Sequence, residues 1–144
     1  MTTVDITPVD ERDNHWEDGR PLFRVYLHGS EESSTGGWTD TYDVRGADLL
    51  QVVDWAQRQA GDQLTYAVAL VVDDEAQESH TRGTGRGLVW LVGMDGNDQP
   101  ASDWEDDVQR RMLARRNDPV VVPVADRMPP YVTPRPLPPR FTQP

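Results

Sequence analysis

The chain of 144 residues has room for one folded domain, since a compact domain usually takes about 100 to 200 residues. It contains neither cysteine nor lysine, which excludes disulfides, thiolate metal sites, Schiff-base chemistry and the lysine of a phosphate-binding loop. Its net charge of −11 disfavours direct binding to nucleic acid, because such binding needs clustered positive charge facing the phosphates.

The sequence also carries signals about location and origin. No run approaches the roughly 18 apolar residues of a membrane span, and the first 20 residues lack the basic and apolar regions of a signal peptide. We therefore expect a cytoplasmic protein that makes no membrane contact. All 14 basic residues are arginine, which is typical of GC-rich coding sequences such as those of certain bacteria and their phages.

Two alternating segments follow a polar start. Residues 1–20 mix acidic and amide side chains with few apolar ones, which predicts an acidic, flexible N-terminal arm. From Phe23 to His28, apolar and polar side chains alternate, as in a half-buried strand. A second alternating run extends from Trp38 to Val44, so the two runs predict a β-hairpin.

The middle of the chain changes period twice. Residues 47–60 have the apolar spacing of an amphipathic helix. Residues 64–72 and 88–92 are apolar at nearly every position, which predicts two neighbouring strands that are buried on both faces. The long polar loop 73–87 joins these two strands.

A second helix and a tail complete the pattern. Ser102 and Glu105 have the spacing of a capping box, and they predict a helix that continues to about Arg116. Residues 120–124 have the composition of one more edge strand, and the prolines of residues 129–139 impose an extended chain.

The order strand, strand, helix, strand, strand, helix predicts an α+β fold. We expect a small antiparallel-rich sheet of four or five strands with the helices packed on one face. The predicted organisation is an arm over residues 1–20, a single domain over residues 21–118 and a proline-rich extended tail over residues 119–144.

The loop 73–87 is a candidate site, because loops of about 15 residues are uncommon in compact domains. Its acidic half with a histidine suits a divalent cation, and its Gly-x-Gly-x-Gly half suits an anion held by backbone amides. A solvated hairpin tip is the alternative, and we expect no bound metal or cofactor. The candidate loop residues are Asp73, Asp74, Glu78, His80, Arg82 and Arg86.

Five tryptophans are many for a domain of this size. Trp38, Trp90 and Trp104 are expected in the core. Trp16 and Trp55 are the candidate anchors for a partner, because aromatic side chains concentrate at interface centres, with core packing as the alternative.

The tail is the other candidate contact. Its segment 135–140 looks like the ligands of domains that read polyproline II helices, because two prolines have the Pro-x-x-Pro spacing. A positive tail lying along an acidic surface of its own or a neighbouring subunit is the alternative. The tail candidates are Tyr131, Arg135, Pro136, Pro139, Arg140 and Phe141.

No catalytic set emerges from the sequence. His28 with the nearby serines Ser30, Ser33 and Ser34 is the only local pairing of a base with a hydroxyl, and we expect His28 to be exposed at a strand end. The leading hypothesis is therefore a non-enzymatic protein–protein interaction or assembly protein that binds another protein or itself.

Two other classes remain open. The first is an acidic mimic of nucleic acid that inhibits a DNA-binding enzyme. Its candidate carboxylates are Asp40, Asp43, Asp48 and Asp54. The second is a small hydrolase or metal-binding protein that uses the loop 73–87.

Overall fold

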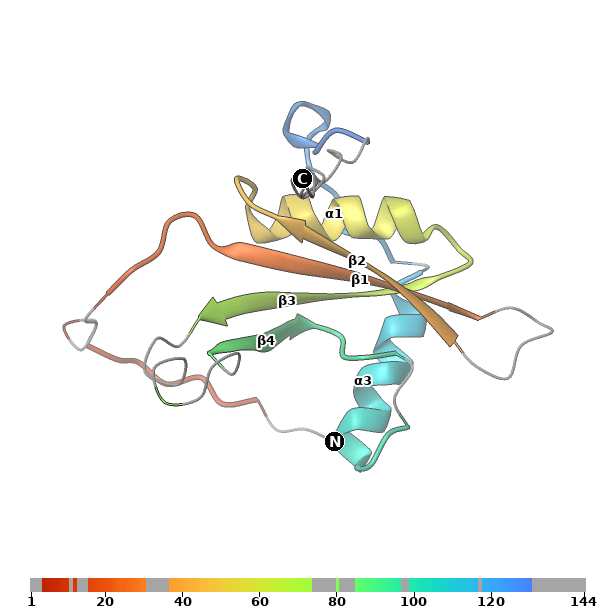
Figure 1. The fold of residues 1–144 in the computed structure, drawn as a ribbon, viewed down its shortest axis with the longest axis horizontal. Coiled ribbons are helices and arrows are strands. Elements are labelled where there is room, and N and C mark those ends of the chain that lie inside the picture. The colour runs from red at the N-terminus through yellow and green to blue at the C-terminus, as the bar shows by residue number, and fades with distance from the viewer. Residues whose placement is uncertain are drawn as a thin grey trace, which may run out of the picture.

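The computed structural model describes residues 4–10, 12, 16–30, 37–73, 80, 85–96, 99–116 and 118–130. Its elements, in chain order, are β1 (Leu22–Ser30), β2 (Gly37–Val44), α1 (Leu49–Ala60), β3 (Thr65–Asp73), β4 (Arg86–Val92), α3 (Asp103–Ala114) and the 3-10 turn η2 (Val124–Asp126) (Figure 1). The six helices and strands predicted up to Arg116 are therefore present, with ends shifted by at most two residues.

The four strands form one sheet in the order β2-β1-β3-β4, and every neighbouring pair is antiparallel. Since β2 and β3 both run antiparallel to β1, they are parallel to each other, and α1 connects them across β1. The predicted α+β class and antiparallel sheet are confirmed. The fifth strand over residues 120–124 is wrong, because residues 120–123 have no strand structure and η2 begins at Val124.

Helix α1 covers one face of the sheet. Asp48 and Gln51 form a reciprocal capping box that satisfies two amides at the helix start. The apolar stripe of α1 then packs on alternate residues of the two central strands, which share a face because strand side chains alternate. The buried residues of this main core are Phe23, Val25, Leu27, Val52, Val53, Trp55, Ala56, Ala60, Tyr66 and Val68.

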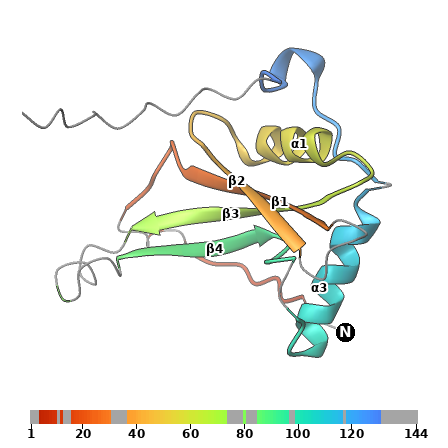
Figure 2. The same cartoon turned by 45° about the vertical axis from the view of Figure 1, so that its right-hand side comes forward.

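Helix α3 lies on the opposite face, so the prediction that both helices share one face is wrong (Figure 2). Met112 of α3 and Met94 pack on Ala67, which alternates along β3 with the α1-facing residues Tyr66 and Val68. The physical reason is the continuous apolar sequence of β3, which exposes apolar surface on both faces and so needs cover on both. The sequence itself predicts that this strand is buried on both faces.

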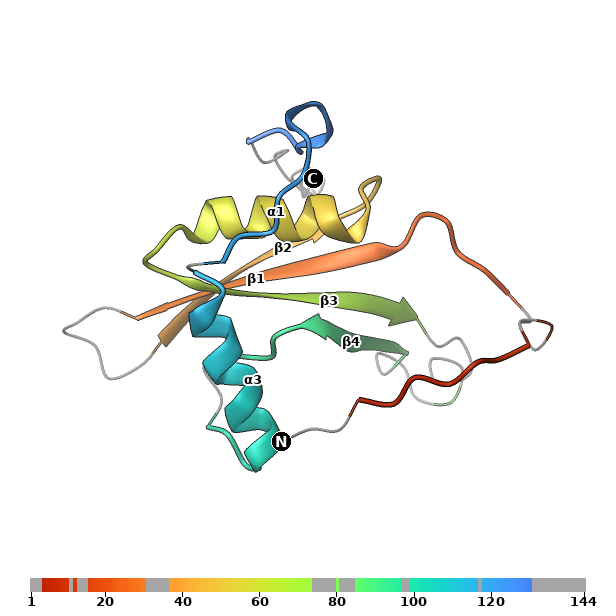
Figure 3. The same cartoon turned by 180° about the vertical axis from the view of Figure 1, so that it is seen from behind.

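The segment after α3 returns across α1 (Figure 3). The amide of Val120 donates to Oε1 of Gln57 at 2.7 Å, and Nε2 of Gln51 donates to the carbonyl of Asp126 at 2.6 Å. Val122 is buried, and Met128 packs against the main core. The first ten residues of the predicted tail are therefore docked on the domain.

The N-terminal arm, unlike the segment after α3, has exposed apolar side chains. Residues 4–10 and 16–20 contain no strand and no α-helix. The exposed apolar residues of the arm are Val4, Ile6, Val9 and Trp16.

In the part of the chain that the structure describes, no helix has the length and apolar character needed to cross a membrane.

Candidate interaction surface

Strand β4 is an exposed apolar edge of the sheet. Its side chains Leu88, Val89, Trp90 and Leu91, here called the β4 patch, are 36 to 49% exposed. The prediction that this strand is buried on both faces is wrong. The reason is its position: β4 pairs only with β3 and stands last in the sheet, whereas α1 packs on β1 and β3, and α3 packs on β3.

The register places half of the β4 patch on the α3 side of the sheet. Leu88 lies opposite Val71, and Trp90 lies opposite Ala69. Because Ala69 has a small side chain, the indole of Trp90 reaches across β3 to Tyr26 on β1, with ring centroids 5.0 Å apart. Trp90 is thus held at one side by Tyr26 while a third of its surface stays exposed.

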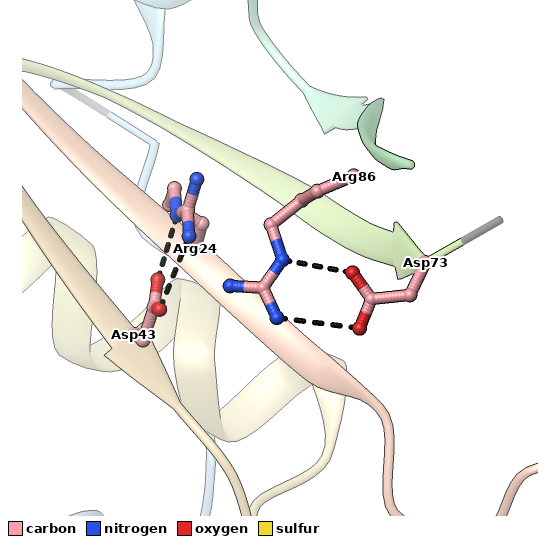
Figure 4. Close-up of polar contacts among 4 residues, drawn as sticks. All are labelled: Arg24, Asp43, Asp73 and Arg86. Carbon is pink, nitrogen blue, oxygen red and sulfur yellow. Dashed lines mark hydrogen bonds and ion pairs between the residues drawn. The ribbon is translucent and has the colours of Figure 1, made fainter. Parts of the chain in front are cut away.

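Two ion pairs lie on the same face of the sheet (Figure 4). Arg24 donates to both carboxylate oxygens of Asp43 at 2.7 and 3.2 Å, and Arg86 donates to both oxygens of Asp73 at 2.8 and 3.2 Å. Hydrogen bonds from Arg86 lower the pKa of Asp73, and hydrogen bonds to Asp43 raise the pKa of Arg24. Each arginine neutralises its aspartate, so these four residues add no net charge beside the β4 patch.

Two candidate ligands of the loop 73–87, Asp73 and Arg86, form one of these ion pairs. They bind each other at the base of the loop, so each is already engaged in an ion pair. His80 is exposed, and Asp74, Glu78 and Arg82 lie outside the described residues. Among the residues that the structure describes, no three His, Asp or Glu side chains are grouped to hold a metal ion.

The other edge of the sheet has a different character. Strand β2 presents Thr39, Asp40, Thr41 and Asp43, all exposed. Charged side chains on an edge strand prevent pairing with another chain. The two edges therefore differ: β2 is polar and acidic, and β4 carries a single charged residue, Arg86.

The tryptophans are placed almost opposite to prediction. Trp55 is only 4% exposed and packs its ring edge-on to Tyr42 at 5.5 Å, which is the core packing given as the alternative to a partner-facing anchor. Trp38, Trp90 and Trp104, which were expected in the core, are 36 to 54% exposed. Trp16 is 77% exposed, in agreement with an accessible position.

The tail candidates Tyr131, Arg135, Pro136, Pro139, Arg140 and Phe141 lie outside the described residues. The structure describes the segment before them as far as residue 130. The polyproline-type contact and the self-docking of this tail therefore both stay predictions.

His28 is buried, and the prediction of an exposed histidine is wrong. The turn after β4 folds over it: the amide of Gly96 donates to Nε2 at 3.2 Å, and Nδ1 lies 3.2 Å from the hydroxyl oxygen of Thr39. Burial lowers the pKa of His28, against a smaller opposing effect of Asp95. With both ring nitrogens engaged in the fold, His28 acts as a structural residue.

Three of the four carboxylates proposed for nucleic-acid mimicry have other roles in the fold. Asp43 pairs with Arg24, Asp48 caps α1, and Asp54 is buried beside Arg58 at 3.1 Å. Asp40 alone lies exposed on β2 without such an assignment. These four described carboxylates therefore do not by themselves form a continuous acidic stripe, and the mimic hypothesis stays a prediction.

Similarity to other proteins adds no functional information. No protein-family model, curated protein or solved structure matches this chain. The fold and its surface define a small α+β domain with one open apolar sheet edge, and the functional argument rests on that edge.

Proposed function

We propose that this chain is a non-enzymatic, cytoplasmic interaction protein that docks another protein chain on the β4 patch. The single observation behind the proposal is the exposure of four consecutive large apolar residues, Leu88 to Leu91, on an edge strand. An edge strand offers a row of unpaired backbone N–H and C=O groups, and native proteins normally protect such edges with charge or cover.

The energetics favour covering this edge. Burying apolar surface contributes about 25 cal/mol per Å², and exposed apolar patches on small proteins commonly mark interaction sites. The neighbouring ion pairs Arg24–Asp43 and Asp73–Arg86 are already neutralised internally. Recognition would therefore depend on shape and on backbone pairing more than on long-range charge attraction.

A photo-crosslinking experiment in cells that produce the protein tests this proposal. A photoreactive phenylalanine analogue replaces Leu88 in one variant and Leu50 in another, and Leu50 is the control because it is an exposed leucine on α1. We expect a discrete cross-linked product of defined mass from position 88 alone. Absence of any product at position 88, or the same products from both positions, would contradict the proposal.

A further inference from the structure

We infer that the chain docked on the β4 patch is β4 of a second copy, paired antiparallel about Leu88, so that two four-stranded sheets become one. This inference rests on the proposed function and specifies its partner. In such a pair the twofold axis is perpendicular to the sheet, and the same edge serves both copies.

The regular part of β4 defines the centre of the pairing. Residues from Arg86 to Trp90 oppose β3 in even register. The irregularity lies beyond Trp90, where the β3 partners are Val68 and Ala69. Bulges interrupt ladder pairing, so the stretch available to a second copy runs from Arg86 to Trp90. Its middle residue is Leu88, which then faces Leu88 of the second copy.

This arrangement also avoids contacts between like charges of the two copies. Arg86 of each copy lies opposite Trp90 of the other on the same face of the sheet, which allows a cation–π contact. Gly87 lies opposite Val89, so no like charges face each other. For a chain of net charge −11, association is least opposed where the carboxylates are absent or paired, and Asp73 beside β4 is paired with Arg86.

Pairing through β2 would be unfavourable by the same reasoning. Asp40 and Asp43 lie exposed on that strand, and the antiparallel approach of two copies would bring acidic side chains together without compensating bases beyond Arg24. The difference in charge between the two edges therefore selects β4.

The exposed area predicts a weak dimer. Four side chains exposing about 60 to 90 Å² each supply about 300 Å² per copy and about 600 Å² per pair, below the roughly 1,200 Å² of stable complexes. The backbone ladder adds hydrogen bonds to this contact. We therefore expect a dissociation constant of about 10 to 100 µM, typical of a small contact, and a dimer that forms on raising the concentration.

Sedimentation and light scattering on the purified full-length chain, from about 5 to 500 µM, test the inference across the expected range. The wild type should change from monomer to dimer. Leu88→Lys and Leu88→Glu, each at a position that meets itself across the axis, should stay monomeric alone and should form a heterodimer when mixed. Leu50→Lys is the matched control and should dimerise like the wild type, since Leu50 lies on α1.

The N-terminal arm is the alternative occupant, because its exposed residues Val4 and Ile6 belong to a segment that runs past the β4 edge (Figure 2). Ile6→Asp in the full chain distinguishes it. A dimer that survives Ile6→Asp supports pairing of β4 with β4, and a dimer lost in that variant overturns it in favour of the arm.

Two further results would overturn the inference. One is a wild type that stays monomeric at every concentration, and the other is a dimer unaffected by Leu88→Lys. If the wild type is monomeric while position 88 still cross-links to a different protein in cells, the docking function stands and only the second copy is refuted. If position 88 also gives no product, both proposals fail.

Discussion

Replacing Trp55 by alanine should cost far more stability than the same replacement of Trp104. Both changes remove the same atoms, yet Trp55 is 4% exposed and Trp104 is 54% exposed. A buried tryptophan hides about 150 to 250 Å², and at about 25 cal/mol per Å² this corresponds to roughly 4 to 6 kcal/mol of transfer free energy. Measured losses for such core changes are about 3 to 5 kcal/mol, which is our expectation for Trp55→Ala.

The exposed control should behave differently. Trp104 lies in the first turn of α3, and we expect Trp104→Ala to cost less than about 1 kcal/mol. Because the total stability of a domain is only about 5 to 15 kcal/mol, Trp55→Phe is included as a milder core change that should cost about 1 to 2 kcal/mol. It keeps an aromatic ring against Tyr42.

The assay is urea unfolding followed by far-ultraviolet circular dichroism, because the signal does not depend on which tryptophan is removed. The free energy of unfolding should decrease in the order wild type, Trp104→Ala, Trp55→Phe and Trp55→Ala. Equal losses for the two alanine variants, or a larger loss at Trp104, would show that Trp55 does not organise the core as described.

Two further predictions concern Gly93 and His28. Gly93 has φ of +78° and its missing Cβ would lie 3.1 Å from Cβ of Ala67, so Gly93→Ala should cost about 1 to 3 kcal/mol in urea unfolding. Gly87→Ala, which meets no atom within 4 Å, should change stability by less than about 0.5 kcal/mol, and equal costs would contradict the packing of α3. Burial lowers the pKa of His28 in the folded protein, so on acidification this histidine is protonated first in the unfolded chain, near pH 6.5. The free energy of unfolding should therefore fall as the pH decreases below about 6.5, until the lower pKa of the folded protein is passed. An NMR titration placing His28 at or above the unfolded value would refute this.

Local chemistry was sufficient to predict the elements of the fold. The alternation from Phe23 to His28, the helical stripe of residues 47–60 and the Ser102 start of α3 each depend on residues within one or two turns of chain. Even here the detail differs: Ser102 accepts from the amide of Glu105 as predicted, whereas the Glu105 carboxylate accepts from Ala101 instead of Ser102. Predictions that depend only on local period and capping were therefore correct to within a few residues.

Predictions about which face or edge is covered were not reliable. The runs at residues 64–72 and 88–92 have nearly the same apolar composition, yet β3 lies between two strands and β4 stands at the edge. The same holds for Trp55 and Trp90, whose exposure depends on neighbours distant in the sequence. No local signal could have identified either case.

The amino-acid sequence alone determined that this is an acidic α+β protein with no cysteine and no lysine. It also determined where most strands and helices lie, because hydrophobic period and caps act over short distances. The order of strands, the opposite placement of α1 and α3, and the exposed edge at β4 were decided only by tertiary structure. They follow from long-range pairing and from which apolar surfaces the two helices are able to cover, and it is at the uncovered edge that we place the function.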